Sequence, residues 1–591
     1  MSTHSTGPAA TGIRSFRPTL TGESHAVSSG HHLATAAGFR ILEGGGNAID
    51  AGVAAGITIN VVIPDNTSFG GVAPIVIYDA REDRVATISG LGRWPRAASI
   101  EHFVRNRAGE IPPGVERVLV PASPDAWMTA LMEHGTLSFE QVVQPALELA
   151  RDGFALTPAV GGRLSRLTDA FERWPSTAAV FAPEGRPLRT GERLVQPALA
   201  RTFERLIEVE RAHSDRGREE AIRAARDFFY EGEIAEEIVA FIRENGGFLT
   251  TGDMADFHVG HELPEVGHFS QNGTEYEVYT CGPWCQGPAF AEALQILSGD
   301  DLAALGHNSA DYIHLVAEAL KLTMADRDAF FGDPDQVDVP IRGLLSPEYA
   351  RSRRAAIDLE AAAPMMPSAG DPWRFEGRAA PDGYAYEPPL PAAGATEPDT
   401  SYVCVVDRLG NMFSATPSDT IGMAPVIPGL GFAPSGRGTQ SWLDPRHPSA
   451  LASWKRPRLT PNALLAFKDG RPWMPFGTPG GDAQCQSTLQ FFLNVTVFGM
   501  TLQQAVEAPR FQSRSWPDSC WPHAYEPGRL DLEARIGDAT AGELARRGHR
   551  IERIDDFARA TGDVCAITRD SGQGSVAAAA DLRADAYAMA R

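Results

Sequence analysis

A proline-rich stretch that ends abruptly at a strand constrains the fold of this chain more than any other feature. Residues 358–398 contain eight prolines among alanines and glycines, without helical or strand periodicity. Such a composition predicts a mobile surface linker, here extending to residue 399, and not a packed element. The next residues, TSYVCVVDRLGNMFSAT, begin at Thr400 and predict two strands joined by a tight turn at Leu409-Gly410-Asn411. A flexible loop therefore meets a buried-looking strand between Asp399 and Thr400.

The rest of the chain mixes helices and strands. A length of 591 residues ordinarily corresponds to two to four domains. Residues 1–25 predict a loose N-terminal arm. Helices are predicted over 31–46, which ends in three glycines, and over 138–152, where Ser138 and Gln141 form a capping box. Because helices and strands are mixed without strict βαβ alternation, the pattern favours a layered α+β arrangement.

Composition excludes several classes of protein. The formal net charge is −22, and an acidic chain repels phosphate backbones, so we expect no nucleic-acid partner. No run of about 18 apolar residues is present, so we expect no membrane span. The six cysteines form no CxxC pair, and the first 25 residues lack the apolar core of a secretory signal. These features predict a protein of the reducing cytoplasm.

Familiar catalytic and ligand-binding motifs are absent from the sequence. There is no HExxH and no Cys/His cluster at ligand spacing, so we expect no metal. There is also no Walker loop, no GxGxxG after a strand and no GxSxG elbow. We therefore expect no cofactor, and the nucleophile, if there is one, is of a less common kind.

Thr400 is the candidate for such a nucleophile. If the bond before it is cut, its new α-amine, with a pKa of roughly 7.7–8.0, can act as general base for its own hydroxyl. One residue then supplies both nucleophile and base, so no separate histidine or lysine is needed as the base. On these residues alone, a purely structural threonine at the start of a strand remains the commoner interpretation.

Eight segments, taken together, resemble the γ-glutamyltransferase family and occur in the family's order. The segment at 400–411 resembles the part of the family that opens with the nucleophilic threonine, and GFRILEGGGNAIDAGVAA at 38–55 resembles its N-terminal helix pair. The others are SFGG at 68–71, VVQPALELARDGF at 142–154, AEALKLTMADRDAFFGDPD at 317–335, KRPRLTPNALL at 455–465, TPGGD at 478–482 and AVEAPRF at 505–511. The resemblance extends from about residue 26 to the C-terminus.

The resemblance implies a four-layer α/β/β/α sandwich of the N-terminal nucleophile hydrolase type, formed from a self-cleaved precursor. Its large subunit would be 26–399, including the linker 358–399, and its small subunit 400–591. Thr400 would be the nucleophile, and Ser418 falls where the family has a threonine whose hydroxyl supports it. Gly480 and Gly481 fall on the glycine pair whose backbone N–H groups form the oxyanion hole.

Several substrate-binding positions depart from the family pattern. Leu91 stands at the position of the arginine that binds a glutamyl α-carboxylate, and Arg93 lies two residues further on, roughly 6–7 Å along a strand. Gln440 stands at the position of the aspartate that binds the α-amine. Arg93 and Arg437 are candidates for binding a different carboxylate, although each is equally well read as a surface arginine.

Two further positions keep a hydroxyl near the expected substrate. Thr420 falls where many members have an asparagine close to the reacting centre. Thr460 matches the second of two serines that contact the substrate, whereas Leu459 replaces the first. Three polar anchors for a zwitterionic glutamyl head are thus altered, at residues 91, 440 and 459, which argues for retained chemistry and a changed substrate.

The expected function is cleavage of a small-molecule amide through an acyl-Thr400 intermediate, after autocatalytic cleavage between Asp399 and Thr400. The acyl group is γ-glutamyl or a related small acid. One alternative is an amidase or acylase for an oxamate-like or cephalosporin-type acyl group. Another is a relative that folds in the same way but is neither processed nor catalytic. The expected partners are the small-molecule substrate and the two subunits of one precursor.

Overall fold

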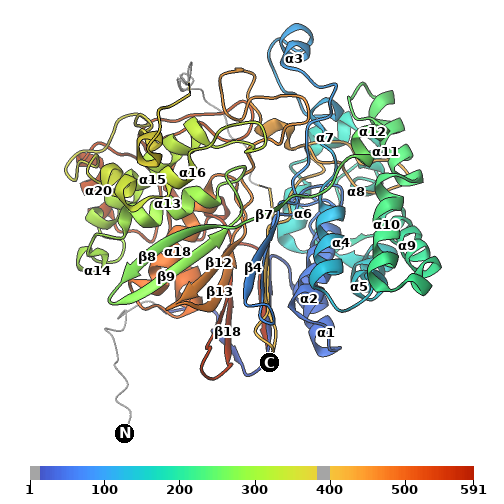
Figure 1. The fold of residues 1–591 in the computed structure, drawn as a ribbon, viewed down its shortest axis with the longest axis horizontal. Coiled ribbons are helices and arrows are strands. Elements are labelled where there is room, and N and C mark those ends of the chain that lie inside the picture. The colour runs from blue at the N-terminus through green and yellow to red at the C-terminus, as the bar shows by residue number, and fades with distance from the viewer. Residues whose placement is uncertain (1–13, 382–398) are drawn as a thin grey trace.

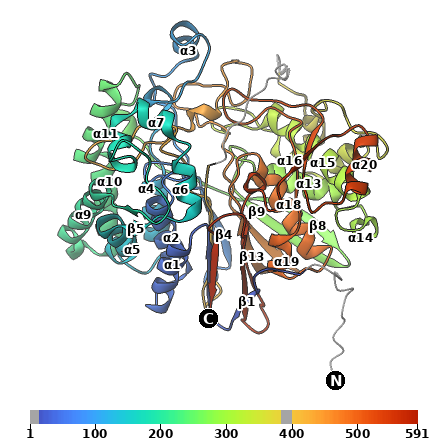
Figure 2. The same cartoon turned by 180° about the vertical axis from the view of Figure 1, so that it is seen from behind.

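Two stacked antiparallel sheets form the centre of the protein, and helices cover both outer faces (Figures 1 and 2). The computed structural model describes residues 14–381 and 399–591. The first seven-stranded sheet has the order β19 (Tyr587–Ala590), β2 (Ala26–Ser29), β10 (Val403–Val406), β11 (Met412–Ala415), β3 (Ile75–Asp79), β4 (Arg84–Ile88) and β7 (His261–Glu262). The second has the order β1 (Leu20–Gly22), β18 (Val576–Ala580), β17 (Cys565–Arg569), β13 (Arg471–Gly477), β12 (Leu464–Lys468), β9 (Thr274–Thr280) and β8 (Glu265–Gln271).

Helices cover the outer face of each sheet and complete four layers. On the first sheet lie α1 (His32–Glu43) and α2 (Ala48–Val62), backed by α4 (Ser123–His134), α5 (Phe139–Asp152), α9 (Pro197–Ala212), α10 (Arg218–Tyr230) and α11 (Glu233–Glu244). On the second lie α13 (Gly287–Leu297), α18 (Ala483–Thr496) and α19 (Leu502–Glu507), backed by α15 (Ala310–Phe330), α17 (Pro347–Arg354) and α20 (Asp538–Arg546). The expected α/β/β/α sandwich is therefore confirmed.

Shorter elements connect these layers. They are α3 (Ile100–Asn106), α6 (Pro158–Leu164), α7 (Thr168–Arg173), α8 (Pro175–Phe181), α12 (Thr251–Ala255), α14 (Leu302–Leu305), α16 (Ile341–Leu344), and the 3₁₀ turns Val115–Arg117, Ser214–Arg216, Pro372–Glu376, Arg437–Gln440 and Arg559–Thr561. Two small sheets join β14 (Phe511–Ser513), β15 (Arg529–Glu533) and β16 (Arg550–Ile554), and β5 (Phe154–Ala155) with β6 (Arg193–Leu194). Within the described ranges, no helix combines the length and apolarity needed to cross a bilayer.

The hairpin of β10 and β11 occupies the middle of the first sheet and is buried on both faces. Val403 and Val405 contribute to the core beneath α1 and α2, whereas Cys404 and Val406 contribute to the core between the two sheets. Side chains alternate across a strand, so an uninterrupted apolar run serves both cores. This explains why TSYVCVV contains no alternation of polar and apolar residues.

The turn of this hairpin is attached to the start of α2. The carboxylate of Asp407 accepts hydrogen bonds from the backbone N–H of Leu409, Asn411 and Ala48. Ala48 is the first residue of α2, where a negative charge stabilises the helix dipole. Asn47 and Asp50 form a capping box at the same end. The position of the hairpin is thereby tied to that of the helix that covers it.

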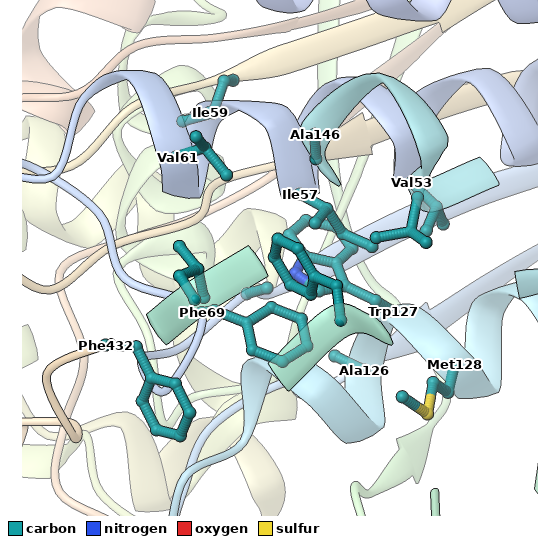
Figure 3. Packing of buried hydrophobic residues seen from close by; sticks show 14 of the residues in the cluster. Val53, Ile57, Ile59, Val61, Phe69, Ala126, Trp127, Met128, Ala146 and Phe432 are labelled. Carbon is teal, nitrogen blue, oxygen red and sulfur yellow. The ribbon is translucent and has the colours of Figure 1, made fainter. Parts of the chain in front are cut away.

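Small residues let α2 approach its neighbours closely. All fifteen residues of this helix are buried. A Cβ on Gly52 would lie 2.2 Å from Cδ1 of Phe413 in β11, and one on Gly56 would lie 2.5 Å from the ring of Trp127 in α4. Trp127 packs among Val53 and Ile57 in this core (Figure 3). Glycine at 52 and 56 therefore sets the distance between α2, the sheet and α4.

Two segments expected to be loose are partly packed, which corrects the sequence-based expectation. Within the arm 1–25, β1 pairs with β18, and Ser24 and His25 bond the last residue, Arg591. Within the linker 358–399, Ala362 donates to Arg547, and Trp373 is only 2% exposed. A prediction based on proline content misses these contacts. The burial of Trp373 and the backbone hydrogen bonds to distant elements leave no periodic pattern in the local sequence. Residues 1–13 and 382–398 lie outside the described ranges.

We predict that Gly52→Ala destabilises the protein by about 1–3 kcal/mol, because the added methyl group overpacks the contact with Phe413. Gly162→Ala is the matched control: Gly162 is an exposed helical residue, and a Cβ there meets nothing within 4 Å. Alanine in a helix is favoured over glycine, so the control should be neutral or slightly stabilising. Urea unfolding midpoints measure both effects, and equal midpoints for the two variants would contradict the packing argument.

Candidate active site

Thr400 lies buried three residues before the start of β10, at the centre of the molecule. Its backbone N–H donates to the carbonyl of Asn66 at 2.9 Å, and its carbonyl accepts from Nδ2 of Asn66 at 3.0 Å. The side chain is fully buried, and the backbone has φ +97°. A β-branched residue rarely adopts positive φ, and such a conformation costs on the order of 1–3 kcal/mol. Strain is therefore located at the residue that sequence reasoning selected.

The hydroxyl of Thr400 is hydrogen-bonded to that of Ser418. Their oxygens are 2.6 Å apart, and either can be the donor. Ser418 follows β11, the second strand of the hairpin, and its N–H donates to the carbonyl of Val72. Residues eighteen positions apart thus meet because the hairpin brings its two ends together. The Thr400 hydroxyl also lies 3.4 Å from Oδ1 of Asp399.

A fully buried guanidinium connects these groups. Nη2 of Arg437 donates to Oδ2 of Asp399 at 2.5 Å and also to the hydroxyl of Ser418. Nε of Arg437 lies 3.5 Å from Oδ1 of Asp419. Burial alone would lower the pKa of Arg437, but the carboxylates of Asp399 and Asp419 outweigh that effect and raise it. Arg437 therefore carries its charge in the interior.

Asp419 is the second carboxylate beside this arginine. It accepts hydrogen bonds from the Ser435 hydroxyl and the Gly436 N–H, both at 2.9 Å. Burial raises the pKa of Asp419 to about 6, although the charge of Arg437 lowers it. Asp419 also has positive φ, +93°, so a second strained residue lies next to Ser418.

A cavity of about 370 Å³ opens beside this group of residues. Asp399, Thr420 and Thr460 line it, together with Gly480 and Gly481. The structure thus places four of the predicted site residues around one space.

The two glycines present unused backbone donors. Gly480 has φ +126° and Gly481 has φ +57°, conformations that favour glycine. Among the described residues, neither N–H donates to a protein acceptor. The loop is anchored by the next residue, Asp482, whose carboxylate accepts from Arg327 at 2.6 Å and from the Ser519 hydroxyl at 2.7 Å. The glycine loop is therefore positioned with its polar N–H groups available to a ligand.

Gln440 and Arg93 occupy different places. Gln440 is buried behind the cavity wall, where its Nε2 donates to the hydroxyl of Thr460 at 2.9 Å. Arg93 is not among the residues that line the cavity. Its guanidinium donates to Asp333 at 3.1 Å and to the carbonyl of Trp454, and pairs with Asp335. The structure thus does not place Arg93, a candidate for binding a different carboxylate, at the cavity, and both of its terminal nitrogens are already bound.

Sequence reasoning missed two features of the site. One is Asp399, whose side chain forms part of the cavity wall and binds Arg437. The other is Arg117, which also lines the cavity and is only 6% exposed. Nothing in the segment VERVLV distinguishes Arg117 from a surface arginine, since only tertiary packing buries it. Asp399 was identified as the residue before the cut. Its pairing with Arg437 was missed because the two residues are thirty-eight positions apart in the sequence.

The tertiary structure also brings together three potential metal ligands that the sequence did not indicate. His314 and Glu318 on α15 meet His549, with Nδ1 of His314 2.9 Å from Nε2 of His549. Nζ of Lys321 donates to Glu318 at 2.6 Å, which places a positive charge against any cation there. This cluster is best described as a hydrogen-bonded contact between α15 and the loop before β16.

The layers and the site together define a class of protein. A threonine at the start of a central strand of an α/β/β/α sandwich, beside a glycine loop, is the arrangement of the N-terminal nucleophile hydrolases. The profile of the family described as Gamma-glutamyltranspeptidase matches residues 34–591. The chain belongs to the gamma-glutamyltranspeptidase family and is an enzyme of the hydrolase and acyltransferase kind.

Similarity to individual relatives extends over nearly the whole chain. The chain is 32% identical to the acylase ACY 1 proenzyme of Pseudomonas sp. (strain SE83), over 95% of this chain and 93% of that protein. The structure of LmbA2991HD matches with a TM-score of 0.90 at 36% identity, over 98% of this chain and 100% of the other. Cephalosporin acylase from Bacillus halodurans matches with a TM-score of 0.83 at 28% identity, over 100% and 99%. The resemblance expected from the sequence is confirmed.

The raised pKa of Asp419 predicts a pH dependence of stability. Between its ordinary pKa of 3.8 and about 6, the folded chain binds a proton that the unfolded chain does not, so stability falls as pH rises through this window. The Asp419→Asn variant cannot titrate at this position. Two proteins are compared, both carrying Thr400→Ala: one keeps Asp419 and the other has Asp419→Asn. The difference between their free energies of unfolding, the first minus the second, should fall by up to about 3 kcal/mol between pH 4 and 7. Urea unfolding at several pH values measures this difference, and parallel curves would contradict it.

Proposed function

We propose that the chain cleaves itself between Asp399 and Thr400 and then hydrolyses an amide through an acyl-Thr400 intermediate. The observation that carries the proposal is the contact between the buried hydroxyls of Thr400 and Ser418, 2.6 Å apart, at a strained residue beside a cavity. The names of the relatives support it, since ACY 1 is described as a proenzyme. The large subunit then ends at residue 399 and the small subunit is 400–591.

In the proposed self-cleavage, the Thr400 hydroxyl is the nucleophile. Its oxygen attacks the carbonyl carbon of Asp399, the C–N bond breaks, and the nitrogen becomes the α-amine of Thr400. Water then hydrolyses the resulting ester, which releases the Asp399 carboxylate and restores the hydroxyl. The Ser418 hydroxyl relays the proton of the Thr400 hydroxyl to the departing nitrogen, so no net proton is gained or lost in the acyl shift. Cleavage also removes the requirement that the peptide hold positive φ at Thr400, so backbone strain favours the reaction.

The same hydroxyl acts in turnover. The α-amine of Thr400 takes its proton, the oxygen attacks the substrate carbonyl, and the amine leaves with a proton. Water hydrolyses the acyl-enzyme to the free acid; an amine acceptor at this step gives transfer. The N–H groups of Gly480 and Gly481 stabilise the oxyanion, a contribution of about 3–4 kcal/mol for one such donor. Thr420 and Thr460 contact the substrate from the cavity wall.

The acyl group departs from the γ-glutamyl pattern. Leu91 is buried in an apolar core and offers no charge to an α-carboxylate. Gln440 offers no charge to an α-amine and is already bonded to Thr460. A related small acid, as in the acylases, fits these changes better than a zwitterionic glutamyl head. The cytoplasmic location expected from the sequence stays part of the proposal, supported by six cysteines that are free thiols.

The first test of the proposal is processing. Thr400→Ala should remain a single chain of 63.5 kDa on a denaturing gel and should show no amidase activity, because the attacking oxygen is lost. Thr400→Ser keeps the hydroxyl and should still be cut. Ser401→Ala, which removes a neighbouring buried hydroxyl, is the control and should mature normally. Complete maturation of Thr400→Ala would overturn the assignment of Thr400 as the nucleophile of self-cleavage. A chain that keeps Thr400 and still stays uncut and inactive would favour the unprocessed relative.

The second test is specificity. We expect γ-glutamyl-p-nitroanilide to be a poor substrate of the matured enzyme, weakened by about 10²–10⁴-fold, if roughly 3–5 kcal/mol of transition-state binding is lost with two charged anchors. Glutaryl-p-nitroanilide differs only by lacking the α-amine and should be used at least equally well. A kcat/KM above about 10⁴ M⁻¹s⁻¹ for the glutamyl compound, within the range of ordinary enzymes, would show that other residues bind its head group.

A further inference from the structure

In the uncut chain, the side chain of Asp399 places a carboxylate beside the proposed nucleophile. Its carbonyl is the group that Thr400 attacks in self-cleavage, and its side chain forms part of the cavity wall. Oδ2 binds Nη2 of Arg437 at 2.5 Å, and Oδ1 lies 3.4 Å from the Thr400 hydroxyl. The chain thus presents to its own nucleophile an acyl group that carries a carboxylate bound by a buried arginine.

The charges around this carboxylate balance only while Asp399 is in place. Two guanidiniums, Arg117 and Arg437, face two carboxylates, Asp399 and Asp419, within one buried group. Arg437 is fully buried, and the side chain of Asp399 is 8% exposed. Charges held this far from water require partners, because an uncompensated buried charge is strongly destabilising.

Arg117 stands out among the buried arginines of the described residues. Ten of them are buried, and nine of the ten lie within 4 Å of a carboxylate. Arg117 is the exception. Its Nη2 donates to the carbonyl of Met423, and its Nε has no partner in the part of the chain that the structure describes. Burial lowers the pKa of Arg117 to about 10, with Cys520, Asp419 and Asp399 opposing the shift. An arginine in the cavity wall therefore lacks the anion that its counterparts have.

Cleavage changes this balance. Asp399 becomes the last residue of the large subunit and is no longer covalently held against Thr400. When its side chain leaves, Arg117 and Arg437 face Asp419 alone, beside a cavity of about 370 Å³. Without that side chain, the two guanidiniums have one carboxylate between them, which leaves room for an anionic group of a substrate.

Resting on the proposed function, we propose that Arg437, assisted by Arg117, forms an anion subsite that Asp399 fills in the precursor and the substrate's carboxylate fills after maturation. In Asp399, two carbons separate the reacting carbonyl carbon from the carboxylate carbon. The acyl group that reproduces this spacing is succinyl, so the substrate class is a mono-amide of a four-carbon dicarboxylic acid. The guanidinium of Arg437 binds the carboxylate at the far end of the acyl group, and Thr400 attacks the amide carbonyl.

A binding experiment tests the subsite without requiring turnover. In Thr400→Ala, which keeps Asp399 in place, succinamate should not change the melting temperature. In Asp399→Ala/Thr400→Ala, succinamate at millimolar concentration should raise it by at least ~2 °C, because a ligand that binds only the folded state stabilises it. Butyramide, which lacks the carboxylate, is the matched ligand and should have no effect. If Asp399→Ala does not fold, Asp399→Ser, whose side chain is also shorter and uncharged, serves in its place.

Two further variants identify the residue responsible. Adding Arg437→Gln to the double variant should abolish the succinamate response, whereas Arg437→Lys should retain part of it. Asp300→Ala in the Thr400→Ala background removes a carboxylate paired with a different arginine, Arg354, 2.7 Å away, and should create no response. Equal responses to succinamate and butyramide, or a response that survives Arg437→Gln, would overturn the inference.

Turnover by the matured enzyme separates failure of this inference from failure of the proposed function. Succinyl-p-nitroanilide should exceed butyryl-p-nitroanilide in kcat/KM by about 10- to 150-fold, the range of one charge-assisted hydrogen bond. Arg437→Gln should reduce this ratio towards one. Equal use of the two anilides, by a small subunit that begins at Thr400, would refute the inference and leave the proposed function standing. A small subunit with another N-terminus would refute the proposed function, and the binding experiment would still decide the subsite.

Discussion

The burial of one hairpin on both of its faces is the constraint on which the rest of the structure depends. β10 and β11 have helices on one side and a second sheet on the other, so every residue of these two strands is inaccessible to water. Thr400 and Ser418 flank the hairpin and meet because antiparallel strands bring their outer ends together. The same double burial places the proposed nucleophile at the centre of the molecule, next to Asp399, which lines the cavity.

Buried charge is the second organising element. Arg437, Asp399 and Asp419 form a chain of ion pairs around the Ser418 hydroxyl, and Arg327 with Asp482 holds the glycine loop. Groups of this kind are costly to bury, and pairing with an opposite charge offsets much of that cost. They therefore fix the relative positions of Thr400, the hydroxyl beside it and the backbone donors more rigidly than apolar packing does, since hydrogen bonds are directional and apolar contacts are not.

Much of the fold and part of the site could be predicted from the sequence, for identifiable reasons. The hairpin, the helices at 32–43 and 139–152 and the position of Thr400 depend on local signals: an apolar run, a capping box and a sharp change of composition. Gly480 and Gly481 were predicted from the resemblance of TPGGD to the family's glycine pair, and both adopt the positive φ that favours glycine. The packing of residues 358–381, by contrast, was missed, because Trp373 is anchored by contacts distant in sequence.

The sequence by itself determined the family, the layer order and the choice of Thr400 as the proposed nucleophile, since these follow from short segments whose patterns survive in one dimension. Only the tertiary structure decided which charges share the site. Arg93 and Arg117 look alike in sequence, yet one is bound by Asp333 and Asp335 at a distance from the cavity and the other is buried in its wall. The physical reason is that an electrostatic environment is set by distances between segments remote along the chain, which no local pattern records.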